Sequence, residues 1–373
     1  MTAMSSRHLS YGFIVFSCIL VAAARTVTPE VASITNYGSV LDQLNRDSCS
    51  SSRWTPSVVL WTCRDSQTFQ PDGNPVDPSI ANTASFSTLP SSPRNPQNLT
   101  LSPPQNVGEL FYKLEADECP PLGLCGDSRW VGWPDTGPVV TSTGVLGAVN
   151  AYAFIARQQL SGLAVVQTDG YSLYRVTSAH AGPQLPTTKV EVSAFWSRTE
   201  IGYGSAGSVL HNGYAYLYGA TPNRKLAVAR AKLGLFGRLE DKKAYEYWVN
   251  GAWTRNAPLL NDTSIVLENT SAIQGTIYWS PKWESFVWIG GDFFPNANFY
   301  VSTSPKAEGP WTPAQLFYSG AVGNGSLPAY SAIAHPSLTD GTGNYIFLTW
   351  TKTRPAPNGA DLYDTPLVRV DWK

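Results

Sequence analysis

The sequence predicts an all-β protein and, within that class, a five-bladed β-propeller. The 373 residues include 31 Gly, 28 Pro and 13 Trp but only 14% charged residues, a mix typical of turn-rich, aromatic β proteins. Short runs of alternating apolar and aromatic residues are separated by Gly or Asn turns, as in β-hairpins. The runs gather into groups that begin roughly 60 to 80 residues apart, somewhat longer than the usual repeat of propeller blades.

Each of the five groups offers three or four short strands. The runs are 58–65 and 84–87; 139, 151–155, 163–166 and 173–176; 208–218, 226–230 and 244–248; 275–279, 285–289, 299–302 and 311; and 331–334, 345–349 and 367–370. Residues 37–45 are expected as a short helix before the first blade. A two-sheet sandwich is the structural alternative, but it needs fewer strands than this sequence supplies.

Residues 1–24 are predicted to be a signal peptide that is removed after its last residue. Arg7 precedes the apolar run 11–20, and small residues follow. A membrane anchor is the competing interpretation, but this run is about half of the roughly 20 residues that a spanning helix needs. We therefore expect a secreted protein without membrane insertion, with a lead segment over residues 25–53 and the propeller over 54–373.

The cysteines fit an oxidising compartment. Cys18 leaves with the signal peptide, and the even number that remains suggests disulfides. More than one connectivity is possible, and we prefer the pairs that are close in sequence, Cys49 with Cys63 and Cys119 with Cys125.

Asn-x-Ser/Thr triplets mark acceptors for N-glycosylation in polar, loop-like stretches. We expect glycans at Asn98, Asn261, Asn269 and Asn324.

Several function classes have little support in the sequence. A net charge of −1 suggests neither nucleic acid nor an anionic membrane as partner. The segment 202–207 matches the dinucleotide fingerprint Gly-x-Gly-x-x-Gly, but strand and turn sequence follows it where a Rossmann site needs a helix. Histidine spacing favours no zinc site. We expect no metal and no cofactor.

Acid and base chemistry would therefore fall to carboxylates. In a propeller, such residues belong near the axis, at the ends of strands in different blades. Asp65 ends an aromatic strand beside Arg64, which would hold it ionised. Asp135 and Glu200 precede the second and third groups at similar offsets. These three are the candidate catalytic residues, although each alone is more often a turn or ion-paired residue.

Flat aromatic rings near these acids are candidates for stacking on sugar C–H faces. We expect Trp61, Trp133 and Trp196, together with Arg64, to contact substrate. Most large aromatic residues in β proteins belong to the core, so only a minority should line a cleft.

The chain resembles a known family over roughly residues 55–373. Trp61 to Phe69, followed by residues 81–85, looks like the Gly-Asp-Thr-type segment and following Asn of the domain-of-unknown-function 4185 family. Segments 213–219 and 308–311 and the pair His335-Pro336 resemble its later blades. The order of these matches along the chain is the evidence.

The resemblance implies a five-bladed propeller of the arabinanase-like type. Characterised bacterial members form glycoside hydrolase family 183 and cleave D-arabinan internally. Asp65 would occupy the acidic position of the Gly-Asp-Thr-type segment, and His335 would lie at the substrate. Arg64 replaces the family Gly and Ser66 the Thr, which changes how a substrate would be placed.

The leading hypothesis is a secreted, monomeric hydrolase of an extracellular, furanose-containing polysaccharide. Asp65 would be the general base and Asp135 or Glu200 the general acid, and an inverting reaction places the two carboxyl groups about 6.5–9.5 Å apart. The alternative is a non-catalytic carbohydrate-binding or wall-associated propeller, with a single carboxylate at the axis. A secreted interaction protein would instead have a sealed, apolar channel. Fold alone does not decide among these functions.

Overall fold

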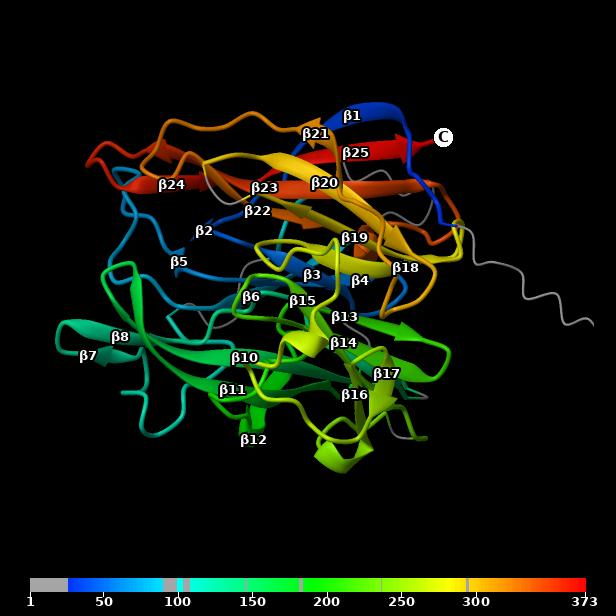
Figure 1. The fold of residues 1–373 in the computed structure, drawn as a ribbon. Helices are drawn as coiled ribbons and strands as arrows, with labels where there is room; N and C mark the ends of the chain where they lie inside the picture. The colour runs from blue at the N-terminus through cyan, green and yellow to red at the C-terminus, as the bar shows by residue number, and fades with distance from the viewer. Residues whose placement is uncertain are drawn as a thin grey trace, which may run out of the picture.

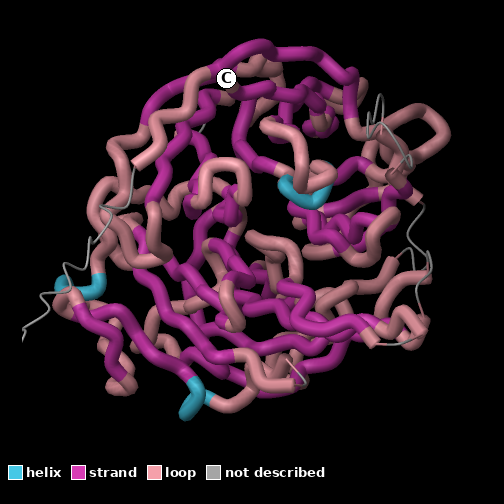
Figure 2. The backbone as a smooth tube through the Cα atoms, turned by 90° about the vertical axis from the view of Figure 1, so that its right-hand side faces the viewer, coloured by secondary structure: helices cyan, strands magenta, loops and turns pink. Residues whose placement is uncertain are grey.

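The computed structural model describes residues 26–89, 99–102, 108–144, 146–180, 184–235, 237–292 and 295–373. The described strands form five antiparallel sheets of three or more strands, arranged around a central axis (Figures 1 and 2). Helix in these residues is confined to the short 3₁₀ segments η1 (Lys242–Ala244), η2 (Thr263–Ile265) and η3 (Pro336–Leu338). The predicted five-bladed β-propeller is confirmed. None of the helices in the described ranges is long and apolar enough to cross a membrane.

Each blade is one sheet whose first strand lies nearest the axis. Blade I contains β3 (Ser50–Arg53), β4 (Val58–Cys63) and β6 (Thr83–Thr88). Blade II contains β9 (Val139–Thr143), β10 (Val149–Ser161), β11 (Ala164–Ser178) and β12 (Thr187–Trp196), with β8 (Ser128–Val131) and β7 (Leu124–Cys125) added beside β10. Blade III contains β13 (Gly207–His211), β14 (Tyr214–Ala220), β15 (Leu226–Lys232), β16 (Tyr245–Val249) and β17 (Ala252–Thr254).

The last two blades complete the ring. Blade IV contains β18 (Thr276–Ser280), β19 (Ser285–Gly291), β20 (Asn298–Ser304) and β21 (Gln315–Ser319). Blade V contains β22 (Ala329–Ala334), β23 (Tyr345–Pro355), β25 (Pro366–Trp372) and β1 (Val31–Ser39), with β24 (Asp361–Asp364) on β23. A separate pair joins β2 (Asn45–Arg46) to β5 (Ser66–Gln67).

Strand β1 closes the ring, because it comes from the N-terminal part of the chain and pairs with β25 at the C-terminus (Figure 1). Ile34 lies opposite Val370 in this pair. The expected short helix over residues 37–45 is therefore wrong. The expected lead segment 25–53 and the propeller start at residue 54 are corrected as well, since β1 and β3 belong to blades. An unpaired β25 would leave its edge hydrogen-bonding groups without partners, and β1 satisfies them.

In blade II the structure differs from the predicted strands. The runs 163–166 and 173–176 were expected as separate strands, but the single strand β11 contains residues 164–166 of the first run and all of the second. The register between β10 and β11 shifts between Ala156 and Gln158 of β10. The residues of β11 at this shift are Asp169 and Gly170, and Gly170 has a φ of +88°. The Asp-Gly pair therefore forms a bulge instead of a turn, as glycine at positive φ permits. Strand β12 was not predicted.

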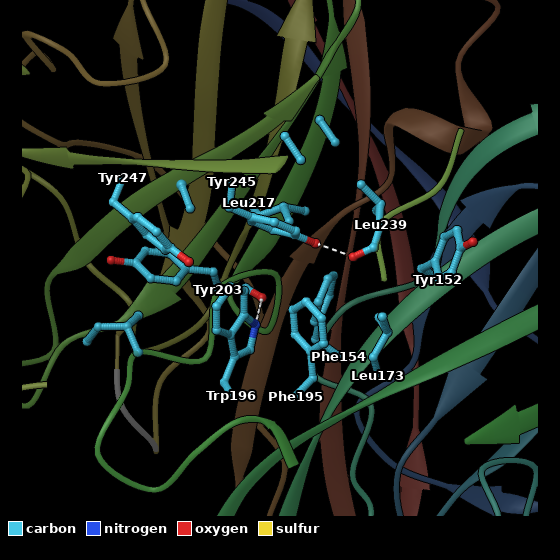
Figure 3. Packing of buried hydrophobic residues seen from close by; sticks show 14 of the residues in the cluster. Tyr152, Phe154, Leu173, Phe195, Trp196, Tyr203, Leu217, Leu239, Tyr245 and Tyr247 are labelled. Atoms are coloured by element: carbon cyan, nitrogen blue, oxygen red, sulfur yellow. Dashed lines mark hydrogen bonds between the residues drawn. The ribbon is translucent and has the colours of Figure 1, made fainter. Parts of the chain in front are cut away.

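A hydrophobic cluster of described residues fills each interface between successive blades. Between blades II and III, Trp196 is buried among Phe154, Phe195, Tyr203 and Tyr245 (Figure 3). Its indole N–H donates to the backbone oxygen of Tyr203 at 2.8 Å. The other four clusters join blades I and II, III and IV, IV and V, and V and I. Because central strands are covered on both faces, β4 is buried along its whole length.

His335 links blade V to blade I in the protein interior. Its side chain is fully buried, Nδ1 lies 2.6 Å from the Ser51 hydroxyl of β3, and Nε2 lies 2.6 Å from the Thr349 hydroxyl of β23. The imidazole also packs on Trp61, with ring centroids 4.7 Å apart. Burial lowers the pKa of His335 to about 3, so the ring is neutral at physiological pH.

We predict that His335→Ala lowers the free energy of unfolding by about 2–4 kcal/mol, because it removes packing and leaves the buried Thr349 hydroxyl without its hydrogen-bond partner. Urea denaturation measures the change. Exposed His180 is the matched control, and His180→Ala should stay within about 0.5 kcal/mol of the parent. Equal stability of the two variants would contradict the proposed link between the blades.

Candidate functional site

The first strands of all five blades enclose a cavity of about 480 Å³ along the axis. A second cavity of about 120 Å³ adjoins it at one end, and both cavities share Asp135, Thr136 and Gly275 among their lining residues. Polar and apolar residues both line the second cavity, and Arg64 and Gln274 contribute to its wall. A chamber with charged and polar groups in its wall therefore adjoins the axial channel.

The chamber lies where the first strand of each blade begins. Polar residues precede or open these strands in every blade: Asp47, Asp135, Ser205, Gln274 and Ser331. Because the first strands all start at the same end of the propeller, residues far apart in sequence come together there. The carboxylates in this set come from blades I and II, and blade III supplies a hydroxyl.

Arg64 interacts with both acids, through an ion pair with Asp135 and through its charge with Asp47. Its guanidinium forms an ion pair with Asp135, and it lies over the ring of Trp133 at 5.4 Å from the centroid. The side chains of Arg64 and Asp135 are 30% and 42% exposed. An ion pair this exposed contributes about 0–1 kcal/mol to stability, so its main effect is to place charge in the chamber.

The carboxyl group of Asp47 has a strongly raised pKa. Burial, followed by the charge of Asp65, raises the pKa of Asp47 to about 7, while Arg64 acts in the opposite direction. The Tyr330 hydroxyl donates to Oδ2 of Asp47 at 2.8 Å, and Oδ1 is buried without a hydrogen-bond partner among the described residues. The carboxyl of Asp47 therefore keeps its proton up to about neutral pH, and it lies close enough to Arg64 for the charge of the arginine to act on its pKa.

Asp65, the acid favoured by the sequence, accepts a hydrogen bond on each of its carboxylate oxygens. Arg129 Nη2 donates to Oδ2 at 2.6 Å, and Trp133 Nε1 donates to Oδ1 at 3.2 Å. Through Trp133, this carboxylate fixes the ring that lies beneath Arg64. Asp65 thus helps to position Trp133, and it lines neither axial cavity.

Both preferred disulfides form, Cys49–Cys63 and Cys119–Cys125. The first joins the segment before β3 to the end of β4, next to Asp47 and Arg64. In the same place the backbone N–H of Arg64 donates to the backbone oxygen of Asp47 at 3.1 Å. The disulfide therefore holds the segment that carries Asp47 next to the segment that carries Arg64.

The structure separates the other predicted site residues from the chamber. Trp61, Trp196 and His335 are fully buried in blade interfaces, so the expected substrate contacts of these three are corrected to core packing. Glu200 receives two hydrogen bonds of 2.9 Å from Lys242 and lines neither cavity. Burial acts to raise the pKa of Glu200, but Lys242 and Ser197 outweigh it and lower the pKa, which does not suit a general acid.

Asp47 was not among the acids predicted from the sequence. The prediction sought one acid at the start of each blade, and Asp47 is at such a position. Strand β3 reads Ser-Ser-Ser-Arg, which has no apolar alternation, so its start was not recognised. Tyr171 was missed too: burial and the charge of Asp135 raise the pKa of this tyrosine, which lines the chamber. Only the folded chain shows that proximity.

The remaining predictions concern glycan acceptors, the signal peptide, the glycine-rich segment and metal binding. Asn261, Asn269 and Asn324 are exposed, whereas Asn98 and the signal peptide lie outside the described residues. The segment 202–207 is a turn entering β13, with the Gly204 N–H bonded to Tyr218, and no helix follows it. Within the described ranges, no group of three or more His, Cys, Asp or Glu is arranged to hold a metal ion.

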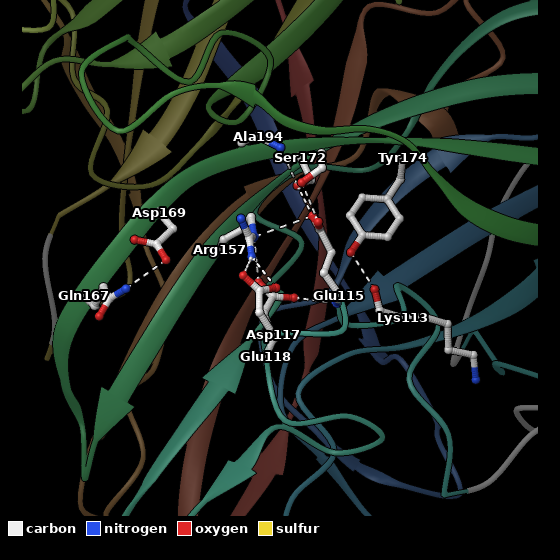
Figure 4. A network of polar contacts seen from close by, with 11 residues as sticks. Lys113, Glu115, Asp117, Glu118, Arg157, Gln167, Asp169, Ser172, Tyr174 and Ala194 are labelled. Carbon is white, nitrogen blue, oxygen red and sulfur yellow. Dashed lines mark hydrogen bonds and ion pairs between the residues drawn. The ribbon is translucent and has the colours of Figure 1, made fainter.

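A second acidic cluster lies away from the axis in blade II (Figure 4). Arg157 binds Glu115, Asp117 and Glu118, and Glu118 is 2% exposed. Burial acts to lower the pKa of Arg157, but the hydrogen bonds and charges of these acids outweigh it and raise the pKa. The Ser172 hydroxyl also donates to Glu115. These contacts attach the segment before β7 to blade II, and the cluster has no opening onto the axial cavities.

We predict that replacing both Cys49 and Cys63 by Ala costs about 3 kcal/mol of stability, because their sequence separation of 14 closes a loop for which chain entropy gives that value. Thermal unfolding measures the loss. The Cys119/Cys125 double variant is the control, since its separation of 6 closes a shorter loop and should cost less. An equal or larger loss in the control would contradict this account.

The raised pKa of Asp47 predicts a pH-dependent stability. Between about pH 4 and 7 the unfolded carboxyl is ionised while the folded one keeps its proton, so stability falls as pH rises through this range. Asparagine does not ionise, so Asp47→Asn should remove this loss of stability. The melting temperature of the variant minus that of the parent should therefore increase from pH 4 to pH 8. A difference independent of pH would show that Asp47 is not perturbed in this way.

The chain has structural but no sequence matches among known proteins. No family model and no curated protein matches it, so membership in the domain-of-unknown-function 4185 family stays a prediction. A structure from Bacteroides ovatus described as a "putative hydrolase" is similar with a TM-score of 0.58 and 14% identity, over 90% of this chain and 87% of that one. At this identity the likeness shows a shared fold.

Other solved structures match more loosely. An exo-β-1,3-galactanase from Phanerochaete chrysosporium has a TM-score of 0.45 and 12% identity, over 89% of this chain and 64% of that one. An α-L-arabinofuranosidase from Podospora anserina has a TM-score of 0.40 and 11% identity, over 91% of each chain. The Bacteroides ovatus structure has a TM-score above 0.5, so the fold rests on it and on the strand topology.

Proposed function

We propose that this chain is a secreted glycoside hydrolase-like propeller that cleaves a furanose-containing polysaccharide at the chamber around Arg64. The observation that carries the proposal is a pair of unlike carboxyls that both interact with this arginine. Oδ1 of Asp47 is buried and the pKa of this carboxyl is raised to about 7, whereas the side chain of Asp135 is 42% exposed and ion-paired. Glycoside hydrolysis needs one protonated and one ionised carboxyl at a shared site.

In the proposed reaction Asp47 is the general acid and Asp135 the general base. Asp47 does not itself line the cavities, so it would supply its proton to the leaving glycosidic oxygen through one intervening water, and Asp135 would accept a proton from the attacking water. This replaces Asp65 and Glu200 of the sequence-based hypothesis. Tyr330 holds Oδ2 of Asp47, which leaves Oδ1 as the oxygen for the transferable proton. The reaction would invert the anomeric centre, and proton NMR of the first product identifies that stereochemistry.

Other features support the setting of this proposal. Both disulfides are formed, which suits an oxidising compartment. Three of the predicted glycan acceptors are exposed. The names of two loosely similar structures refer to enzymes acting on galactan and on arabinofuranosides. We therefore keep an extracellular polysaccharide as the proposed partner and a monomer as the proposed state.

We predict that Asp135→Asn lowers kcat/KM on the best substrate of an arabinan and galactofuran panel by about 10³-fold, within the usual range for loss of acid–base catalysis. Reducing-end release measures it. Asp47→Asn should lower activity as well, and the activity of the parent should fall above about pH 7 as Asp47 loses its proton. Glu200→Gln is the matched control, because this carboxylate pairs with Lys242 instead of Arg64 and lines neither cavity.

Activity equal to the parent in Asp135→Asn would contradict the proposal, as would a parent that hydrolyses no glycan. The second candidate function, glycan binding without turnover, has its own observation. Ser205 takes the place of an acid in blade III, and Asp135 is the one carboxylate among the described residues that line the two axial cavities. Binding without hydrolysis on the same panel would favour this second function.

A further inference from the structure

A separate cavity of about 200 Å³ lies between blades IV and V. Its walls come from the turn 281–284 after β18, from residues 339–344 before β23, and from Trp372 of β25. The chamber around Arg64 lies where the first strands begin, whereas these segments follow the ends of β18 and β22. The cavity is therefore at the opposite end of the propeller.

Aromatic side chains held by their neighbours line this cavity. Trp283 packs edge-on against Trp372 with ring centroids 5.4 Å apart. His211 covers Trp279 at a centroid distance of 3.8 Å. Rings fixed in this way lose little conformational freedom when a ligand binds, which makes aromatic residues efficient contact surfaces.

Polar groups accompany the rings. Lys282 is exposed in the turn after β18 and forms no ion pair with an acid of the described part of the chain. Asn344 uses its side-chain nitrogen to bind the Lys373 backbone oxygen at 2.9 Å, while its side-chain oxygen accepts no hydrogen bond from a described residue. The cavity thus combines flat apolar faces with a donor and an acceptor at its edge.

This combination fits a sugar ring, which has an apolar C–H face bordered by hydroxyl groups. Stacking on an indole satisfies the face, and edge groups such as an ammonium and an amide oxygen satisfy the hydroxyls. The cavity also shares Tyr278, Trp279 and Pro336 with the axial cavity. It therefore adjoins the axial cavity that leads to the chamber.

We propose that the cavity between blades IV and V is a second glycan-binding site, which holds a segment of the polysaccharide away from the point of cleavage. The inference rests on the proposed function for its choice of ligand. Two sites on one polymer raise the overall affinity, because binding at one site concentrates the chain near the other. Short oligosaccharides gain nothing from the second site.

Trp283→Ala tests the proposal, with affinity gel electrophoresis in arabinan and β-1,3-galactan as the measurement. We expect the dissociation constant for the retained polymer to rise about tenfold, while kcat/KM on a short soluble oligosaccharide is unchanged. Trp253→Ala is the matched control. Trp253 is another half-buried tryptophan, stacked by Arg230 at 4.2 Å on blade III and outside this cavity.

If Trp283→Ala does not fold, a second variant tests the same cavity. Lys282→Ala changes an exposed side chain and should raise the same dissociation constant about threefold. Polymer binding equal to the parent in every folded variant would overturn the proposal, as would a parent that binds no polysaccharide. Selective loss of binding to a proline-rich peptide would overturn it too, since such peptides also dock in aromatic grooves.

The binding measurement separates this inference from the proposed hydrolysis. Weaker polymer binding by Trp283→Ala in a chain that cleaves nothing would support the second site and contradict the hydrolase. Hydrolysis by the chamber with unchanged polymer binding in the variant would support the hydrolase and contradict the second site.

Discussion

The closure of blade V against blade I is the constraint on which the rest of the structure depends. Strand β1 pairs with β25, and a hydrophobic cluster containing Trp61 and Phe347 fills the interface. Along the axis, His335 bridges β3 and β23. Near the chamber, the hydroxyl groups of Ser48 and Ser331 lie 2.6 Å apart. Without this seam, the ring of blades has open ends and no enclosed axis.

The candidate site lies on the same seam. Asp47 belongs to the segment before blade I, and Tyr330, which donates to it, belongs to blade V. The carboxyl is buried because the two blades meet, and burial is the largest cause of its raised pKa. The Cys49–Cys63 disulfide holds the blade I side of this arrangement. Closure therefore creates the proton-carrying group, and the exposed ion pair of Arg64 adds charge more than stability.

The sequence predicted the fold class because hairpin spacing and composition are local signals. It placed Asp135 before β9, and the structure puts that residue in the chamber wall. It missed β1 and β3, whose pairing partners lie elsewhere in the fold. It also assigned Trp196 to the substrate, since periodicity cannot tell which face of a buried strand meets another blade. Contacts between distant blades thus explain both the missing acid and the misplaced aromatic residues.

A crystal structure of the Asp135→Asn variant with an oligosaccharide from its best-bound polysaccharide is the most direct test of the central claim, that the chamber around Arg64 is the place of glycan chemistry. The account predicts a sugar ring in contact with Arg64 and residue 135, with its glycosidic oxygen facing Asp47. A fully occupied ligand elsewhere, with an empty chamber, would contradict it.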